Sequence, residues 1–218
     1  MGVAAYAGRV PHAPGVGFDL DLTLIDTAPG FGAVLEVLGA ELGVAFPVAE
    51  MTARLGPPLD HMLVPHLEPE RIGPAVDRFR VLYPDHAITT VPALPGAVDA
   101  IAAVRRAGGR VVVVTGKFTP NAQLHLSHLD LDHDHLTGEV WGVGKGEVLR
   151  REGCAIYVGD HVHDVEGAHA AGILSVSVLT GGSTRDELLA AGTDVVLDDL
   201  TRFPEWYEGH LAAGGRTA

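Results

Sequence analysis

The chain has 218 residues, enough for one large hydrophobic core or for a core with a small accessory domain. Its formal net charge of −13 argues against a general nucleic-acid-binding protein, which needs a basic surface. No apolar run is long enough to cross a bilayer, and the single cysteine, Cys154, excludes an intrachain disulfide. We see no secretory signal and expect a cytoplasmic protein with neither a nucleic acid nor a membrane as partner.

The first predicted elements are a strand and a long helical block. Residues 1–15 are rich in Ala, Gly and Pro and predict a flexible arm, and residues 16–21 predict a short strand that ends in acids. From 27 to 92 apolar residues recur at spacings of three and four, which is typical of helices with one buried face. Glycines and prolines at 43, 56–58 and 73–74 are predicted to separate these helices.

After residue 92 predicted strands and helices alternate. The strands cover 110–115, 155–158, 174–178 and 195–197, and the helices cover 97–107, 145–152, 165–171, 186–191 and 201–207, with a further helix capped by Thr119. Alternation predicts an α/β fold with a Rossmann-like parallel sheet and helices on both faces. The predicted organisation is a catalytic core of 16–26 and 93–218 with an α-helical cap, 27–92, inserted after the first strand.

Three of the predicted strands end in residues that can do chemistry. Asp19 and Asp21 end the first, Thr115-Gly116-Lys117 follow the second, and Gly159-Asp160 follow a later one. Because the carboxyl ends of parallel strands meet at one edge of a sheet, we expect these residues to converge there.

The carboxylates at this edge suit phosphoryl transfer. One of Asp19 and Asp21 could attack phosphorus while the other moves a proton, although an acidic pair can also simply cap a turn. Asp160 and Asp164 suit Mg²⁺, although acids at a helix start can also act only as caps.

Four carboxylates in one place need positive charge nearby. Mg²⁺ and Lys145 could supply it, and Thr115 with the backbone N–H of Gly116 could hold phosphoryl oxygens. The alternatives are a solvated surface position for Lys145 and an ordinary strand-end hydroxyl for Thr115.

Four segments in this order resemble the motifs of the haloacid dehalogenase superfamily. They are Phe18-Asp19-Leu20-Asp21-Leu22-Thr23-Leu24, Val114-Thr115-Gly116-Lys117, Lys145, and Tyr157-Val158-Gly159-Asp160 with Asp164. The resemblance covers about residues 16–208 and is closest to the phosphoglycolate-phosphatase-like branch, which has a small helical cap between the first two motifs. It implies a magnesium-dependent phosphatase that hydrolyses a small phosphorylated metabolite through an aspartyl-phosphate intermediate.

The resemblance also implies a role for each residue of the four segments. Asp19 is the implied nucleophile, Asp21 the acid/base, and Thr115 and Lys145 the phosphate ligands. The implied Mg²⁺ ligands are Asp19, the backbone oxygen of Asp21, Asp160 and, mainly through water, Asp164, with Thr23 fixing the loop. Three positions depart from the family pattern: Leu22 replaces the usual Gly, Gly116 a frequent Asn, and His161 a frequent Ser.

Several interpretations stay open at this stage. A phosphomutase uses the same intermediate, and a non-catalytic phospho-ligand binder could keep the fold, whereas a carbon–halogen dehalogenase would not call for Asp21 and the metal carboxylates. Arg54 in the cap could contact substrate or only solvent, and Lys117 has the pattern of a surface charge at the rim. The His-rich segment 125–135 is either a transition-metal site or an exposed helix end with its loop. The sequence predicts neither the substrate nor the oligomeric state.

Overall fold

The computed structural model describes residues 14–214. Most of the predicted flexible arm, 1–15, lies outside the described residues, except that Gly15 already belongs to the first strand. Within residues 14–214, no helix combines the length and the apolar character that spanning a bilayer requires.

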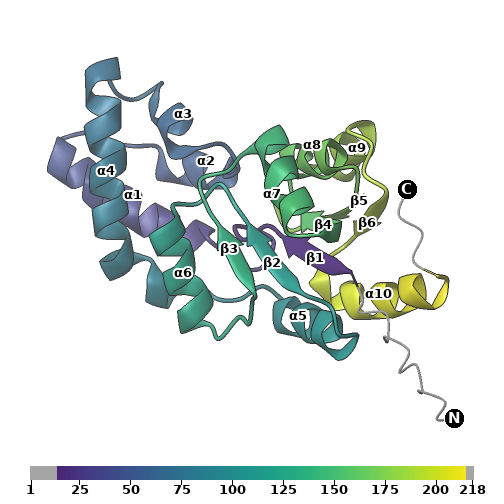
Figure 1. Cartoon of the computed structure of the whole chain (residues 1–218). Helices are drawn as coiled ribbons and strands as arrows, with labels where there is room; N and C mark the ends of the chain where they lie inside the picture. The colour runs from purple at the N-terminus through teal and green to yellow at the C-terminus, as the bar shows by residue number, and fades with distance from the viewer. Residues whose placement is uncertain (1–13, 215–218) are drawn as a thin grey trace, which may run out of the picture.

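An all-parallel sheet of six strands lies at the centre of the molecule in the order β3-β2-β1-β4-β5-β6 (Figure 1). The strands are β1 (Gly15–Phe18), β2 (Val111–Val114), β3 (His135–Thr137), β4 (Cys154–Gly159), β5 (Leu174–Val178) and β6 (Val195–Leu197). The predicted α/β class is confirmed. The sequence did not predict β3, a three-residue edge strand that begins at the last residue of the His-rich segment and forms because its backbone pairs with Val112–Val114.

Helices cover both faces of this sheet (Figure 1). One face carries α5 (Ala97–Arg106), α6 (Thr119–His128) and α10 (Phe203–Ala212), and the other carries α7 (Lys145–Arg151) and α8 (Val162–Ala171). Successive side chains of β2 pack on opposite faces of the sheet: Val111 and Val113 on the first face, and Val112 and Val114 on the second. Shorter elements complete the core: η2 (Gly142–Gly144), α9 (Arg185–Ala190) and η3 (Leu200–Arg202).

The chain between β1 and α5 is helical and stands to one side of the sheet (Figure 1). It comprises α1 (Ala28–Leu42), α2 (Val48–Ala53), α3 (Leu59–Leu63), α4 (Pro69–His86) and η1 (Ile88–Thr90). Its buried side chains, from Phe31 to Ile88, form a hydrophobic cluster of their own. The predicted block of helices is therefore present, and we refer to it as the cap. Its separate cluster supports the predicted domain boundaries 27–92, which stay a prediction.

One prediction within the cap and one at α6 are wrong in detail. The sequence did not predict α2, and residues 73–74 do not separate two helices, because α4 runs through Pro74 without a break. The buried face of α4, which includes Phe79 and Tyr83, packs against the α1 side of the cap, and this packing outweighs the lost backbone hydrogen bond. Helix α6 begins at Thr119 itself, with Phe118 as its N-cap residue.

Candidate active site

The sequence motifs converge at the carboxyl ends of the strands, as predicted. Asp19 and Asp21 follow β1, Thr115 follows β2, Asp160 follows β4, Lys145 opens α7 and Asp164 lies in α8. All six line one cavity of about 430 Å³ between this edge of the sheet and the cap.

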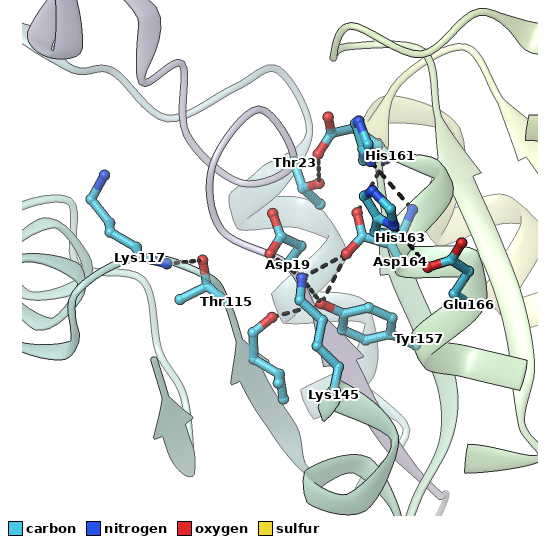
Figure 2. Close-up of polar contacts among 12 residues, drawn as sticks. Asp19, Thr23, Thr115, Lys117, Lys145, Tyr157, His161, His163, Asp164 and Glu166 are labelled. Atoms are coloured by element: carbon cyan, nitrogen blue, oxygen red, sulfur yellow. Dashed lines mark hydrogen bonds and ion pairs between the residues drawn. The ribbon is translucent and has the colours of Figure 1, made fainter. Parts of the chain in front are cut away.

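Lys145 forms the centre of the site. Its side chain reaches up from α7, as Figure 2 shows, and its ammonium donates to Asp19 Oδ1 at 2.7 Å, to Asp164 Oδ1 at 2.6 Å and to the Tyr157 hydroxyl at 2.9 Å. The Tyr157 hydroxyl in turn donates to the backbone oxygen of Val114 at 2.6 Å. Only 1% of Lys145 is exposed, so the alternative of a surface lysine is excluded.

Asp19, Asp160 and Asp164 each offer a carboxylate oxygen to a common point, and these oxygens lie within 4.8 Å of one another. All three residues are buried. Burial raises the pKa of Asp19 above its usual range because Lys145 offsets only part of this effect. Burial also raises the pKa of Asp160, and the charges of Asp164 and Asp19 add to it. One lysine is thus insufficient for three buried carboxylates, and a hard divalent cation fits the all-oxygen donor set.

Asp21 has a different partner. Its Oδ1 accepts from the Lys117 ammonium at 2.8 Å and from the Thr27 hydroxyl. Burial acts to raise the pKa of Asp21, but the charge and hydrogen bond of Lys117 outweigh it and the pKa is lowered. The interpretation of Lys117 as a surface charge is wrong: only 8% of its side chain is exposed, and its ammonium lies 4.4 Å from the centre of the Tyr83 ring.

Thr115 and Gly116 lie beside this pair at the same end of the cavity. The Thr115 hydroxyl oxygen accepts from the backbone N–H of Lys117 at 3.2 Å, so its own hydrogen remains free to donate into the cavity (Figure 2). Gly116 is exposed.

The loop after β1 contains a leucine in a glycine-like conformation, at the position where the resembled family usually has glycine. Leu22 has a φ of 59°, the left-handed conformation that glycine adopts freely and that costs other residues about 1–2 kcal/mol. Its side chain lines the cavity and packs against the cap cluster, which offsets part of this cost. The Thr23 hydroxyl donates to Asp160 Oδ1 at 2.9 Å and links this loop to β4.

The loop after β5 covers Asp160 from the other side. A Cβ atom on Gly181 would overlap the Asp160 carboxylate, so this position requires glycine. Neither Gly181 nor Tyr157 was predicted to belong to the site: Tyr157 stands in the fourth family-like segment without a role of its own, and Gly181 stands in none of the four segments.

Arg54 is the predicted site residue that the structure does not bring to the others. It is exposed at the end of α2 and is absent from the cavity lining, although its neighbours Leu55 and Gly56 are part of it. Its role in binding substrate stays a prediction. Arg80 of α4 does line the cavity, and its guanidinium lies 4.4 Å from the centre of the Phe118 ring.

The His-rich segment is an exposed helix end only in part. His128, the last residue of α6, is exposed, as expected for a helix end. His125 is fully buried in α6, and its Nε2 lies 3.0 Å from the hydroxyl of Tyr83 in the cap. His135 belongs to β3. Among residues 14–214, the cluster of three or more candidate metal ligands is the one formed by the three aspartates, so the histidines do not form a second one.

We expect the stability of the protein to fall between about pH 6.5 and pH 4 because of His125. Burial and the nearby Lys117 charge lower its pKa to about 4. The Asp21 charge opposes this shift and the His128 charge adds to it, both with smaller effects. The unfolded chain binds a proton on this residue near pH 6.5, whereas the folded chain does not until about pH 4. The free energy of unfolding should therefore decrease by about 3 kcal/mol over this range from His125 alone.

Urea unfolding at several pH values measures this effect. His125→Gln keeps a hydrogen-bonding side chain but cannot titrate, and the variant should show a shallower pH dependence than the natural chain. Equal pH dependences of the free energy of unfolding in the two proteins would show that His125 does not cause the loss of stability.

Comparison with known proteins agrees with this geometry. The sequence profile of the haloacid dehalogenase-like hydrolase family matches residues 16–169, and a second, HAD-hydrolase-like profile matches 147–203. The chain is 28% identical to a probable phosphatase, IndB, of Dickeya dadantii over 86% of this chain and 90% of that one. It is also 28% identical to a phosphoglycolate phosphatase of Caulobacter vibrioides, over 87% and 89% of the two chains.

Solved structures share the fold. A haloacid dehalogenase-like family protein of Streptococcus pneumoniae superposes with a TM-score of 0.79 at 23% identity, over 89% of this chain and 98% of that chain. The family profile covers well over half of the sequence and includes the four motifs whose residues meet in the cavity. The chain therefore belongs to the haloacid dehalogenase-like hydrolase family.

Proposed function

We propose that this protein is a magnesium-dependent phosphatase that hydrolyses a phosphomonoester through an aspartyl-phosphate on Asp19. The observation that carries the proposal is the meeting of the Asp19, Asp160 and Asp164 carboxylates in the cavity, with the Lys145 ammonium bound to Asp19 and Asp164. The relatives named as phosphatases support the same class of reaction.

Binding of the phosphoryl group would fall to residues at the ends of β1 and β2. Thr115 would donate its hydroxyl hydrogen to one phosphoryl oxygen, and the backbone N–H of Gly116, which also lines the cavity, would donate to another. Asp19, Asp160 and Asp164 would hold Mg²⁺, which when bound neutralises phosphoryl charge. Lys145 would fix the Asp19 carboxylate, since its ammonium already binds Oδ1.

Asp21 would move protons. In the second half of the reaction it would take a proton from the attacking water, and its lowered pKa keeps it in the ionised form that can accept one. In the first half it would give a proton to the leaving oxygen. For this step the ion pair with Lys117 must loosen when substrate fills the cavity, because the pair stabilises the ionised form.

The cap would limit access to this site. Its helix α4 touches the core through Tyr83 and His125, and Arg80 reaches Glu139 at 3.1 Å. We propose that the cavity opens and closes as these contacts break and form. We also propose a cytoplasmic location, which fits the single, buried Cys154.

Removal of divalent metal tests the proposal. With 4-nitrophenyl phosphate as substrate, chelation should reduce phosphate release at least about 100-fold, and added Mg²⁺ should restore it. Ca²⁺ should not restore it, because calcium takes more ligands at longer distances and would alter the position of Asp19. Full activity after exhaustive chelation would contradict the proposal. Isomerisation of a hexose 1-phosphate without phosphate release would instead identify a phosphomutase.

A further inference from the structure

The cavity above the phosphate-binding residues is large and mostly apolar. Its volume of about 430 Å³ lies in the range of pockets that bury ligands much larger than a two-carbon phosphate. Aromatic rings contribute to its lining from both the core and the cap: Phe31, Phe79, Tyr83, Phe118 and Trp141. A leaving group that filled this space would contact carbon atoms on most sides.

The charges of the lining disfavour a second anionic group on the substrate. The lining contains six aspartates but only three cationic side chains, those of Arg80, Lys117 and Lys145. Each cation has a carboxylate partner: Lys145 binds Asp19 and Asp164, Lys117 binds Asp21, and Arg80 binds Glu139. Even with one divalent cation bound, the lining keeps an excess of negative charge before a phosphate enters.

Trp141 stands beside the phosphate site because Gly116 has no side chain. A Cβ atom at position 116 would lie 3.2 Å from the Trp141 ring, closer than ordinary contact. The ring also packs against His161 and His163, with centroid separations of 5.7 and 4.8 Å. His161 lines the cavity as well, and Figure 2 shows it near Asp164. Two departures from the family pattern, Gly116 and His161, thus meet at one aromatic wall.

We infer that the substrate of this phosphatase carries an uncharged, apolar leaving group, best a planar ring, which contacts Trp141 and His161. The inference rests on the proposed function and specifies its substrate class. It places monoesters with a second anionic group, such as the carboxylate of phosphoglycolate, among the poor substrates. Apolar contact with the wall would supply binding energy, whereas a second anion would meet unpaired aspartates without a free cation.

Matched substrates test the inference. Benzyl phosphate and 4-carboxybenzyl phosphate differ by one carboxylate far from the phosphate, and their hydrolysis releases similar alcohols. Ethyl phosphate and phosphoglycolate form a second pair that differs by one carboxylate. With Mg²⁺ present, kcat/KM for benzyl phosphate should exceed that for 4-carboxybenzyl phosphate by at least about tenfold. The kcat/KM for benzyl phosphate should also exceed the kcat/KM for ethyl phosphate by about tenfold. A preference for either carboxylated substrate would overturn the inference.

Variants of Trp141 identify the wall. Trp141→Ala should reduce the ratio of kcat/KM between benzyl and ethyl phosphate about tenfold, and Trp141→Phe should keep most of it. Trp206 of α10 lies outside the cavity lining, and Trp206→Ala is the matched control with an unchanged ratio. Because a ratio of two substrates does not depend on the folded fraction, loss of stability cannot imitate the effect. An unchanged ratio in Trp141→Ala would overturn the assignment.

Binding of phosphonates separates this inference from the proposed function. Calorimetry should give a Kd for benzylphosphonate at least about tenfold lower than that for 4-carboxybenzylphosphonate. If no monoester is hydrolysed but this preference holds, the proposed function fails and the assignment of the cavity stands. If monoesters are hydrolysed but the preference is reversed, the proposed function stands and the inference fails.

Discussion

Replacing Asp19 by asparagine is expected to reduce phosphate release by about 10⁴-fold or more, because the amide cannot attack phosphorus. The fold should survive. The Asp19 carboxylate is buried among other acids, so removing its charge relieves repulsion while Lys145 keeps its bond to Asp164. Phosphate release at saturating Mg²⁺, with circular dichroism to check folding, measures the effect.

An exposed aspartate of the cap provides the control. Asp85 lies on α4 outside the cavity lining, and Asp85→Asn should retain the activity of the natural chain. A folded Asp19→Asn protein with substantial activity would show that this carboxylate is not the nucleophile.

Replacing Lys145 by arginine should reduce turnover on the order of 10²–10³-fold. The Lys145 ammonium fits among Asp19, Asp164 and the Tyr157 hydroxyl at 2.6–2.9 Å, and a planar, bulkier guanidinium cannot occupy this enclosed position without moving the carboxylates. Turnover by the folded variant, compared with its thermal unfolding, distinguishes a damaged site from a damaged fold.

Lys117→Arg is the comparison for this variant and should lose less activity. Lys117 is also buried, but it binds Asp21 and lies over the Tyr83 ring, and a guanidinium can make both kinds of contact. If Lys145→Arg kept full turnover, the enclosed ammonium would not be needed for the reaction. If Lys117→Arg lost more, Asp21 and its partner would limit turnover.

Much of the fold and the meeting of the four motifs followed from the sequence. Buried runs such as Val111–Val114 alternate with helical segments, and parallel strands bring Asp19, Thr115 and Asp160 to one edge of the sheet. The sheet thereby makes residues that are distant in the chain into neighbours, and this consequence needs no side-chain detail. The confirmed family resemblance rests on the same residues.

The contacts between cap and core could not be predicted in this way. Lys117 was predicted to be a surface charge because nothing near it in the sequence shows that Tyr83 of α4 covers it. His125 read as exposed for the same reason, although Tyr83 binds it. Which side chains of an inserted domain face the core depends on how that domain docks, and the sequence pattern of its helices reports only which face is apolar.

Local rules also failed where packing opposed them. The Gly73-Pro74 pair predicted a helix end, yet α4 continues because its apolar side is buried against α1. Strand β3 has only three half-buried residues and no apolar run from which a strand could be predicted. Leu22 stands in a conformation typical of glycine, held by the surrounding loop and the cap.

The covalent intermediate offers the most direct test of the central claim. Asp21→Asn should slow attack by water, whereas 4-nitrophenolate leaves without help from an acid, so this variant should accumulate the phosphorylated enzyme. Mixing Asp21→Asn with 4-nitrophenyl phosphate and Mg²⁺, followed by an acid quench and mass spectrometry of peptides, locates the phosphoryl group. The account predicts a burst of about one 4-nitrophenolate per enzyme and one phosphoryl group on Asp19, both absent from the double variant Asp19→Asn/Asp21→Asn. Turnover without phosphate on Asp19, or phosphate on another residue, would contradict it.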